Sequence, residues 1–188
     1  MVYILLGEGF EEAEALVPAD LLRRAGIQVA LVALDGPEEG GDPLVTGSHG
    51  IAVRADVVLE DVDVDAMEML ILPGGLGGVE SIQMDLFALA LIQRAYDRGA
   101  YLAAICAAPT ILAHQGFLDR RKAVCYPGME DQMGSAVVQK GQQVVVDGHM
   151  ITAEAAGSSF DFALKLVEIL KGREAAHSVR ESVHYRRG

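Results

Sequence analysis

The sequence contains no tryptophan and only two cysteines, Cys106 and Cys125, among its 188 residues. The two thiols have no Cys-x-x-Cys spacing, and two cysteines in a chain of this length argue against a secreted disulfide scaffold. Each cysteine therefore needs an explanation of its own.

Long apolar runs are also missing. The first run spans residues 2–6 and ends at Gly7 and Glu8, so it is too short to cross a membrane. It also lacks the basic start of a signal peptide. We therefore expect a cytoplasmic protein that has no membrane partner.

Positive charge is scarce, since 15 Lys and Arg face 27 Asp and Glu and give a net charge of −12. Binding to nucleic acid is driven by basic side chains that release counterions, so a nucleic-acid partner is not expected. The basic C-terminal segment 171–188 differs, with five Lys or Arg and two Glu, a net +3 against −15 for the rest of the chain. We interpret this segment as a solvated helix or a partner contact rather than a catalytic element.

Apolar strands and helical stretches alternate along the chain, which predicts one α/β domain over residues 1–188. Continuous apolar strands separated by helices indicate a doubly wound, mostly parallel sheet covered on both faces. Gly, Pro and acidic residues at 36–43 predict a turn-rich connection. The expected strands are 2–6, 28–34, 69–72 and 101–105, and the expected helices are 11–25, 83–98 and 107–114.

The third quarter of the chain has a different pattern. Residues 144–152 predict two short strands around the Asp147-Gly148 turn, a small β-hairpin added beside the parallel sheet. Ser158 is then expected to cap a final amphipathic helix at 160–170. The apolar face predicted for this helix contains Phe160, Ala163, Leu164, Val167 and Leu170.

Cys106 lies between an apolar strand and the start of a helix, which is the geometry of a nucleophile elbow. Ligands of parallel sheets bind at the carboxyl edge, where segments 7–14, 72–75 and 104–109 are expected to converge. The helix start, including the Ala107 N–H group, favours a thiolate. The alternative is that Cys106 is simply a small buried hydrophobic residue.

Two further features support a site at this edge. Gly74 and Gly75 follow a strand directly and can present N–H groups to a developing oxyanion, although a tight turn is the simpler explanation. Glu14 shares a helix face with Val17, Pro18 and Leu21, so we expect it to be buried, with a raised pKa, and to donate a hydrogen bond to the thiolate. The alternative for Glu14 is an exposed acid in the first helical turn.

These segments together resemble the ThiJ/PfpI superfamily, most closely its DJ-one branch. The resemblance runs nearly end to end and rests on residues 9–14, 17–26, 72–75, 103–109 and 157–163. It implies a flavodoxin-like, doubly wound three-layer sandwich, usually a homodimer, with no cofactor and no metal. It further implies that Cys106 is a reactive, easily oxidised thiol, that Glu14 is its hydrogen-bonding acid, and that Gly74 and Gly75 supply backbone amides.

The sequence departs from this branch at two places. Tyr126 occupies the position of the histidine in the branch's Cys/His/Glu site, and a phenol with a pKa near 10 is a poor proton acceptor at neutral pH. Tyr126 is therefore at most an auxiliary hydrogen-bond donor. Glu154 lies within the segment where the branch has an Arg-Gly-Pro run, and an acid there would disfavour anionic substrates. His49 and His114 are interpreted as loop and helix-packing residues.

Two functions compete. The first is an enzyme acting on small reactive carbonyls, glyoxalase- or deglycase-like, in which the Cys106 thiolate forms a hemithioacetal and Glu14 carries the proton. The second is a non-enzymatic sensor of oxidants, or a redox-regulated chaperone, in which Cys106 is oxidised to sulfinic acid.

Other functions fit less well. A glutamine amidotransferase needs a late His-x-Glu, and a PfpI-type peptidase has histidine directly after the nucleophile, where this chain has Ala107. Gly7 and Gly9 match the start of a dinucleotide-binding fingerprint, but Glu12 occupies the position of its third glycine, which argues against dinucleotide binding. Residues 74–78 do not lead into the Gly-Lys-Ser/Thr of a P-loop.

Overall fold

A computed structural model describes residues 1–36 and 41–186. Four residues of the turn-rich connection expected at 36–43, and the last two of the basic segment, lie outside the described residues. In the described part of the chain, seven strands form one sheet in the order β10-β11-β7-β6-β1-β2-β5, and β10 alone runs antiparallel to its neighbour. The strands are β1 Val2–Leu6, β2 Val29–Ala33, β5 Val57–Val58, β6 Met69–Leu72, β7 Tyr101–Ile105, β10 Val144–Asp147 and β11 Met150–Ala153.

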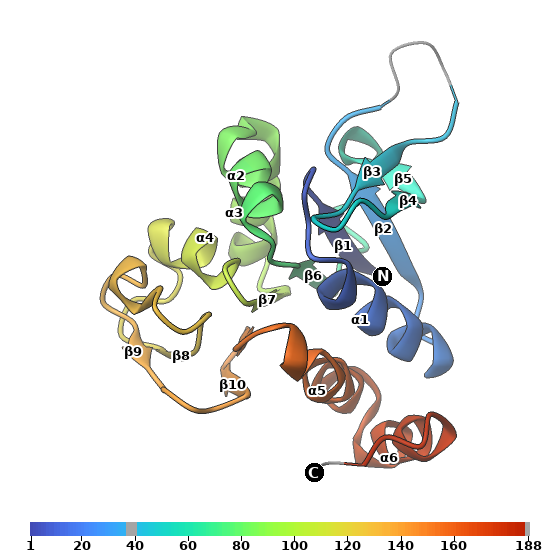
Figure 1. The fold of residues 1–188 in the computed structure, drawn as a ribbon, viewed down its shortest axis with the longest axis vertical. Coiled ribbons are helices and arrows are strands. Elements are labelled where there is room, and N and C mark those ends of the chain that lie inside the picture. Colours follow the sequence, from blue (N-terminus) through green and yellow to red (C-terminus); the bar gives the residue numbers. More distant parts are fainter. Residues whose placement is uncertain (37–40, 187–188) are drawn as a thin grey trace.

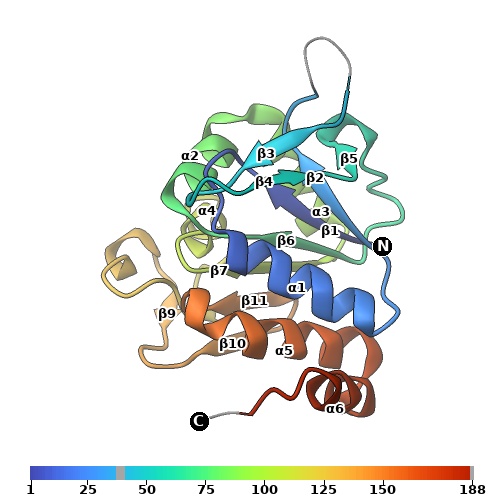
Figure 2. The same ribbon diagram turned by 45° about the vertical axis from the view of Figure 1, so that its right-hand side comes forward.

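Helices cover both faces of this sheet (Figure 1, Figure 2). One face carries α1 and α5, which pack side by side, with α6 lying against α5. The other face carries α2, α3 and α4. The helices are α1 Glu12–Arg24, α2 Leu76–Met84, α3 Leu86–Asp97, α4 Pro109–His114, α5 Ser159–Lys171 and α6 Arg173–Ser182.

Alternate residues of the strands divide the core into two clusters. Ile4 of β1 packs in the cluster that holds Ala19 of α1 and Phe162 of α5. Its neighbour Leu5 packs in the other cluster, which holds Ile92 of α3. Successive strand side chains point to opposite faces, so the two clusters are the two interfaces of a three-layer sandwich. The α/β sandwich expected from the sequence is confirmed.

The sheet changes winding direction between β1 and β6, because the chain moves from β1 to β2 on one side and later returns to β6 on the other. At such a point the loops after adjacent strands separate and leave room at the carboxyl edge. The Gly7 turn follows β1 and the Gly74-Gly75 turn follows β6, so both lie at this edge next to the end of β7.

The hairpin at 144–152 is confirmed as β10 and β11, with Gly148 at a φ of 63° in its turn. It extends the main sheet rather than lying beside it, because β11 pairs in parallel with β7. The hairpin of β3 and β4 and the short parallel pair of β8 and β9 were not predicted from the sequence. These strands are β3 Leu44–Thr46, β4 Ala52–Arg54, β8 Lys122–Ala123 and β9 Val137–Val138.

Two helix predictions need correction. The helix expected at 83–98 is observed as α3, which begins later, at Leu86, because the Asp85 side chain accepts hydrogen bonds from the N–H groups of Phe87 and Ala88. Helix α2, which precedes it, was not predicted. Ser158 precedes α5 but makes no side-chain cap hydrogen bond. The apolar face predicted for α5 is confirmed at Ala163, Leu164 and Val167, which are buried. Phe162 is also fully buried, whereas Phe160, which was expected on this face, is 36% exposed.

Within the described residues, no helix is both long enough and apolar enough to span a lipid bilayer.

Candidate functional site

Cys106 forms a strained elbow at the end of β7. Its φ is 65°, in the left-handed region that residues with a Cβ atom rarely adopt. The elbow is held on both sides, since the Cys106 N–H donates to the Ala153 carbonyl at 3.0 Å and the Tyr126 N–H donates to the Cys106 carbonyl at 2.7 Å. Backbone strain of this kind costs about 1–3 kcal/mol and persists only where the surroundings enforce it.

The Cys106 sulfur is half-buried and lies against two backbone donors. The N–H groups of Ala107 and Gly75 both hydrogen-bond to it and act to lower the thiol pKa. These are two of the three residues expected to supply amides to the site. The third, Gly74, does not face the sulfur, because its N–H donates to Oε2 of Glu14 at 2.8 Å. Gly74 therefore positions the acid rather than serving an oxyanion.

Glu14 is completely buried in the first turns of α1, next to the Cys106 thiol. Its Oε2 atom accepts the Gly74 hydrogen bond, while Oε1 is buried with no nitrogen or oxygen partner among the described residues. Burial raises the pKa of Glu14 to about 7, against the smaller lowering effects of the hydrogen bonds from Gly74 and Cys106. A carboxyl group with such a pKa exchanges protons readily at neutral pH.

The electrostatics of the thiol differ from those expected from the sequence. Burial, followed by the negative charge of Glu14, raises the pKa of Cys106 to about 12 and outweighs the two backbone amides. Helix α4 gives little help, because it has six residues and begins at Pro109, beyond the elbow. Near neutral pH the site therefore holds a thiol beside a carboxyl group that is only partly ionised.

The glycine pair leaves no space for side chains. A Cβ atom on Gly74 would lie 2.5 Å from Glu14 Oε2 and 2.7 Å from the Cys106 Cβ atom. Gly75 has a φ of 83°, and a Cβ atom there would lie 2.5 Å from the Gly9 carbonyl oxygen. Contacts between real Cβ atoms and other heavy atoms do not occur at these distances. The absence of side chains at Gly74 and Gly75 therefore permits both the tight turn and the close approach of Glu14 to Cys106.

The profile of the DJ-1/PfpI family matches residues 1–169 of the chain. The chain belongs to the DJ-1/PfpI family. Protein dj-1beta of Drosophila melanogaster is 35% identical to it over 96% of this chain and 94% of the relative. A protein of Pyrococcus abyssi that is named a deglycase is 31% identical over 90% of this chain and 99% of the relative.

Solved structures give the same result. The crystal structure of Drosophila melanogaster DJ-1beta superposes with a TM-score of 0.89 at 34% identity, covering 99% of this chain and 98% of that one. The oxidized form of Toxoplasma gondii DJ-1 has a TM-score of 0.90 at 31% identity, with coverages of 99% and 98%. The DJ-1 branch expected from the sequence is therefore confirmed.

Two further predicted residues of this DJ-1/PfpI member lie near the elbow. Tyr126 is placed there by its main-chain hydrogen bond to Cys106, and its side chain is 48% exposed. Glu154 follows Ala153, the residue that binds the Cys106 N–H, and is half-buried. The second cysteine, Cys125, is only 3% exposed, and burial raises its pKa to about 11.

The sequence did not indicate a polar cluster beside the site. Glu12, 5% exposed, accepts hydrogen bonds from the His49 N–H at 2.8 Å and from the Ser48 hydroxyl at 3.3 Å, and its Oε2 lies 2.9 Å from His49 Nδ1. Burial acts to raise the pKa of Glu12, but hydrogen bonds from His49 and from the backbone outweigh it and lower the pKa to about 2. The contact joins α1 to the turn between β3 and β4. No local sequence pattern encodes this contact, because Glu12 and His49 are 37 residues apart.

Within the described residues, Glu11, Glu12 and His49 form a group that could hold a metal ion, because their ligand atoms lie within 4.8 Å of one another. The Glu12 oxygens are already bonded to the turn, and His49 is 68% exposed, as expected of a loop residue. We assign the cluster the role of anchoring the turn.

His114 is exposed at the end of α4, with its Nδ1 atom 3.2 Å from Gln83 Nε2.

Proposed function

We propose that this DJ-1/PfpI family member acts on small reactive carbonyls, in the manner of a glyoxalase or deglycase, with Cys106 as nucleophile and Glu14 as proton carrier. The observation that carries the proposal is the buried Glu14 carboxyl group, with a pKa of about 7, beside a thiol on a strained elbow. A general base works best when its pKa is near the working pH, so Glu14 takes the role for which Tyr126 is unsuited. The deglycase of Pyrococcus abyssi supports this class of chemistry by similarity.

The first step is addition of the thiol to the carbonyl. As sulfur attacks the carbonyl carbon, the new S–C bond forms, the C=O π bond opens, and Glu14 takes the thiol proton. Glu14 then gives this proton to the alkoxide, which yields the hemithioacetal. The N–H groups of Ala107 and Gly75 stabilise negative charge on the sulfur as the proton leaves.

For a dicarbonyl such as methylglyoxal, the remaining steps are internal. The proton on the former aldehyde carbon moves to the neighbouring carbon, so the first carbon is oxidised to a thioester and the second is reduced to an alcohol. Water then cleaves the thioester and restores the thiol, and the sum is methylglyoxal plus water giving lactate. Negative charge on Glu11 and Glu154 near this edge favours such neutral substrates over anionic ones.

Turnover of methylglyoxal to lactate by the purified protein tests this proposal. We expect lactate to form with the wild type and with Cys125→Ala, and to fall to background with Cys106→Ala. Equal rates for the wild type and Cys106→Ala would contradict the proposal.

A second function is favoured by the difference in solvent access between the two cysteines, since Cys106 is half-buried and Cys125 is only 3% exposed. We propose as the alternative that Cys106 senses peroxide, and that the protein is then a redox sensor or a redox-regulated chaperone. Two peroxide molecules are reduced to water while the thiol gains two oxygen atoms and becomes a sulfinate, whose oxygens the amides of Ala107 and Gly75 would bind. A solved structure of the related Toxoplasma gondii DJ-1 is of its oxidized form.

Mass spectrometry after mild peroxide treatment tests the alternative. A gain of two oxygens confined to Cys106 supports it, and equal oxidation of Cys125 contradicts it. Family likeness also leads us to propose a homodimer, which sedimentation velocity measures directly.

A further inference from the structure

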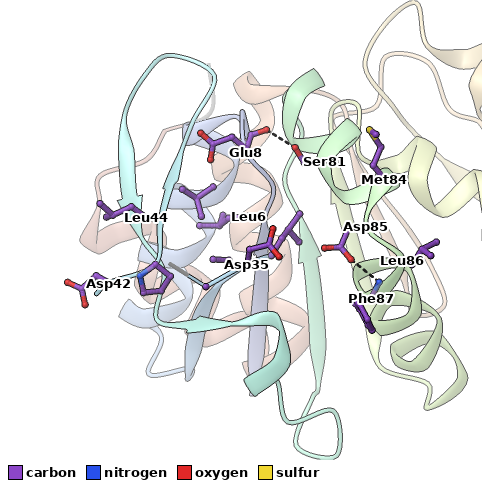
Figure 3. Close-up of a pocket in the computed structure, with 15 residues that line it drawn as sticks. Leu6, Glu8, Asp35, Asp42, Leu44, Ser81, Met84, Asp85, Leu86 and Phe87 are labelled. Atoms are coloured by element: carbon purple, nitrogen blue, oxygen red, sulfur yellow. Dashed lines mark hydrogen bonds between the residues drawn. The ribbon is translucent and has the colours of Figure 1, made fainter. Parts of the chain in front are cut away.

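A groove that does not include Cys106 opens at the same edge of the sheet, beyond the ends of β1 and β2 (Figure 3). It has a volume of ≈ 840 Å³. Leu6 and Ala33, at the ends of β1 and β2, line the groove, and Leu44 of β3 lies on one side. The junction of α2 and α3 forms the other side (Figure 3).

The rim of this groove carries large apolar side chains that face solvent. The exposed fractions are 64% for Leu44, 77% for Met84, 78% for Leu86 and 80% for Phe87. Three of these four residues are clustered at the short link between α2 and α3, where Asp85 starts the second helix. A group of exposed Met, Leu and Phe around a hollow is typical of a docking surface, because isolated exposed apolar residues need no explanation but a contiguous group does.

The groove is also acidic. Four carboxylates line it, those of Glu8, Asp35, Asp42 and Asp85, and no Lys, Arg or His is among the described residues that line it. Arg54 forms an ion pair with Asp42 at 3.4 Å, which leaves a net charge of about −3 on the groove and this neighbour together. The Glu8 and Asp85 side chains accept hydrogen bonds from backbone N–H groups, which do not remove their charge.

The groove and the Cys106 site share one structural element but remain separate. The Ser81 hydroxyl of α2 donates to the Glu8 carbonyl at 3.1 Å, which fixes α2 against the turn after β1. The same turn contacts the cysteine site through Gly9, whose carbonyl lies against Gly75. A molecule in the groove would therefore sit beside the cysteine site without covering Cys106.

We infer that this groove binds a basic amphipathic segment of a partner protein. The apolar face of the segment contacts Leu44, Met84, Leu86 and Phe87, and its Lys or Arg side chains face the four carboxylates. The charge complementarity selects a cationic partner. Apolar side chains that stand at an open rim suit a helical segment laid into the groove. Flexible Met and Leu side chains accommodate such a face without a fixed shape.

The test uses a labelled synthetic peptide of about 18 residues, with leucines on one helical face and lysines on the other. Fluorescence anisotropy measures its affinity for the full-length protein. A second peptide with the same leucines and glutamate in place of lysine controls for charge, and a scrambled leucine-lysine peptide controls for amphipathicity. We expect binding of the first peptide and at least about tenfold weaker binding of the other two.

Variants locate the binding. The double variant Leu86→Ser/Phe87→Ser should weaken binding of the leucine-lysine peptide at least about tenfold. Asp35→Asn should weaken it less and reduce its dependence on salt. The matched control is Val137→Ser/Val146→Ser, which removes two apolar side chains that are 49% and 43% exposed elsewhere and should leave the affinity unchanged.

Two outcomes would overturn the inference. The first is equal affinity for the wild type, the double variant and Asp35→Asn, which would mean that the peptide binds elsewhere. The second is a change of oligomeric state in the double variant by sedimentation velocity, which would make the groove a contact between copies of this chain. The alkylation rate of Cys106 and the melting temperature should match the wild type in every variant, because all of the altered side chains are exposed.

Discussion

Glu14 and Gly74 are joined by a hydrogen bond of 2.8 Å that holds a buried carboxyl group beside the Cys106 thiol. The bond occupies Oε2, and Oε1 is buried without a hydrogen-bond partner among the described residues. The site thus depends on a contact between α1 and the turn after β6, sixty residues apart in the chain.

The carbonyl activity should depend on the ionisation of Glu14. Because the carboxylate form is the one that accepts the thiol proton, we expect turnover of methylglyoxal to rise as the pH passes through about 7, the pKa of Glu14. Glu14→Gln should lose this rise and about 10²–10⁴-fold of the rate, as expected for removal of a general base. The pH dependence of the initial rate measures both effects. A Glu14→Gln variant with the wild-type profile would exclude Glu14 as the base.

Gly74→Ala should separate the acid from the thiol. Its new Cβ atom would meet Glu14 Oε2, the Cys106 Cβ atom and the Ile105 carbonyl oxygen at 2.5–3.0 Å, so something must move. We expect a loss of about 1–3 kcal/mol of stability and a strong loss of activity. Gly157→Ala is the matched control, because nothing lies within 4 Å of a Cβ atom there. Denaturant unfolding and turnover measure the two quantities, and unchanged activity in Gly74→Ala would contradict the packing described for the site.

Glu12 should stabilise the fold in a pH-dependent manner. Its pKa is lowered from 4.5 to about 2 in the folded chain, so its contribution is present above about 4.5 and is lost as the pH falls toward 2. Glu12→Gln should lower the free energy of unfolding at pH 7 by about 1–3 kcal/mol, with a smaller difference at pH 3. The exposed Glu60→Gln should change neither value. A difference between the wild type and Glu12→Gln that is the same at both pH values would argue against the role of this carboxylate.

The Tyr126 hydroxyl should not be needed for activity, and a histidine at this position should act as a better base. Its side chain is 48% exposed, and its contact with Cys106 is made by the main chain. Tyr126→Phe should therefore keep the wild-type rate. Tyr126→His adds a group with a pKa near 6.5 and should raise the rate about tenfold. Steady-state kinetics compare the three proteins, and a large loss in Tyr126→Phe would give the hydroxyl a role that the structure does not indicate.

Much of the framework was predictable because it is encoded locally. The strands Val2–Leu6, Met69–Leu72 and Tyr101–Ile105 have the predicted bounds, since each is a continuous apolar run ended by glycine, proline or cysteine. Burial of Glu14 followed from the apolar face that it shares with Leu21.

The parts that were missed depend on contacts between distant segments. The Gly74 amide was expected to face an oxyanion, but its partner is Glu14 on another element. The Cys106 thiolate was expected to be stabilised by the helix start and by a hydrogen bond from Glu14, whereas burial and the negative charge of Glu14 raise the thiol pKa. The link from Glu12 to His49 joins a helix to a hairpin that has no strong strand signal. Such features arise only once the chain has folded.

The most direct test of the coupled pair is the pH dependence of Cys106 alkylation, measured in a Cys125→Ala background with and without Glu14→Gln. The negative charge of Glu14 raises the thiol pKa, and a neutral amide removes that charge, so the apparent pKa of Cys106 should fall in the Glu14→Gln variant. The background protein should also change its alkylation rate near pH 7, where Glu14 ionises. Identical alkylation profiles for the two proteins, or a higher thiol pKa in Glu14→Gln, would contradict a proton shared between Cys106 and Glu14.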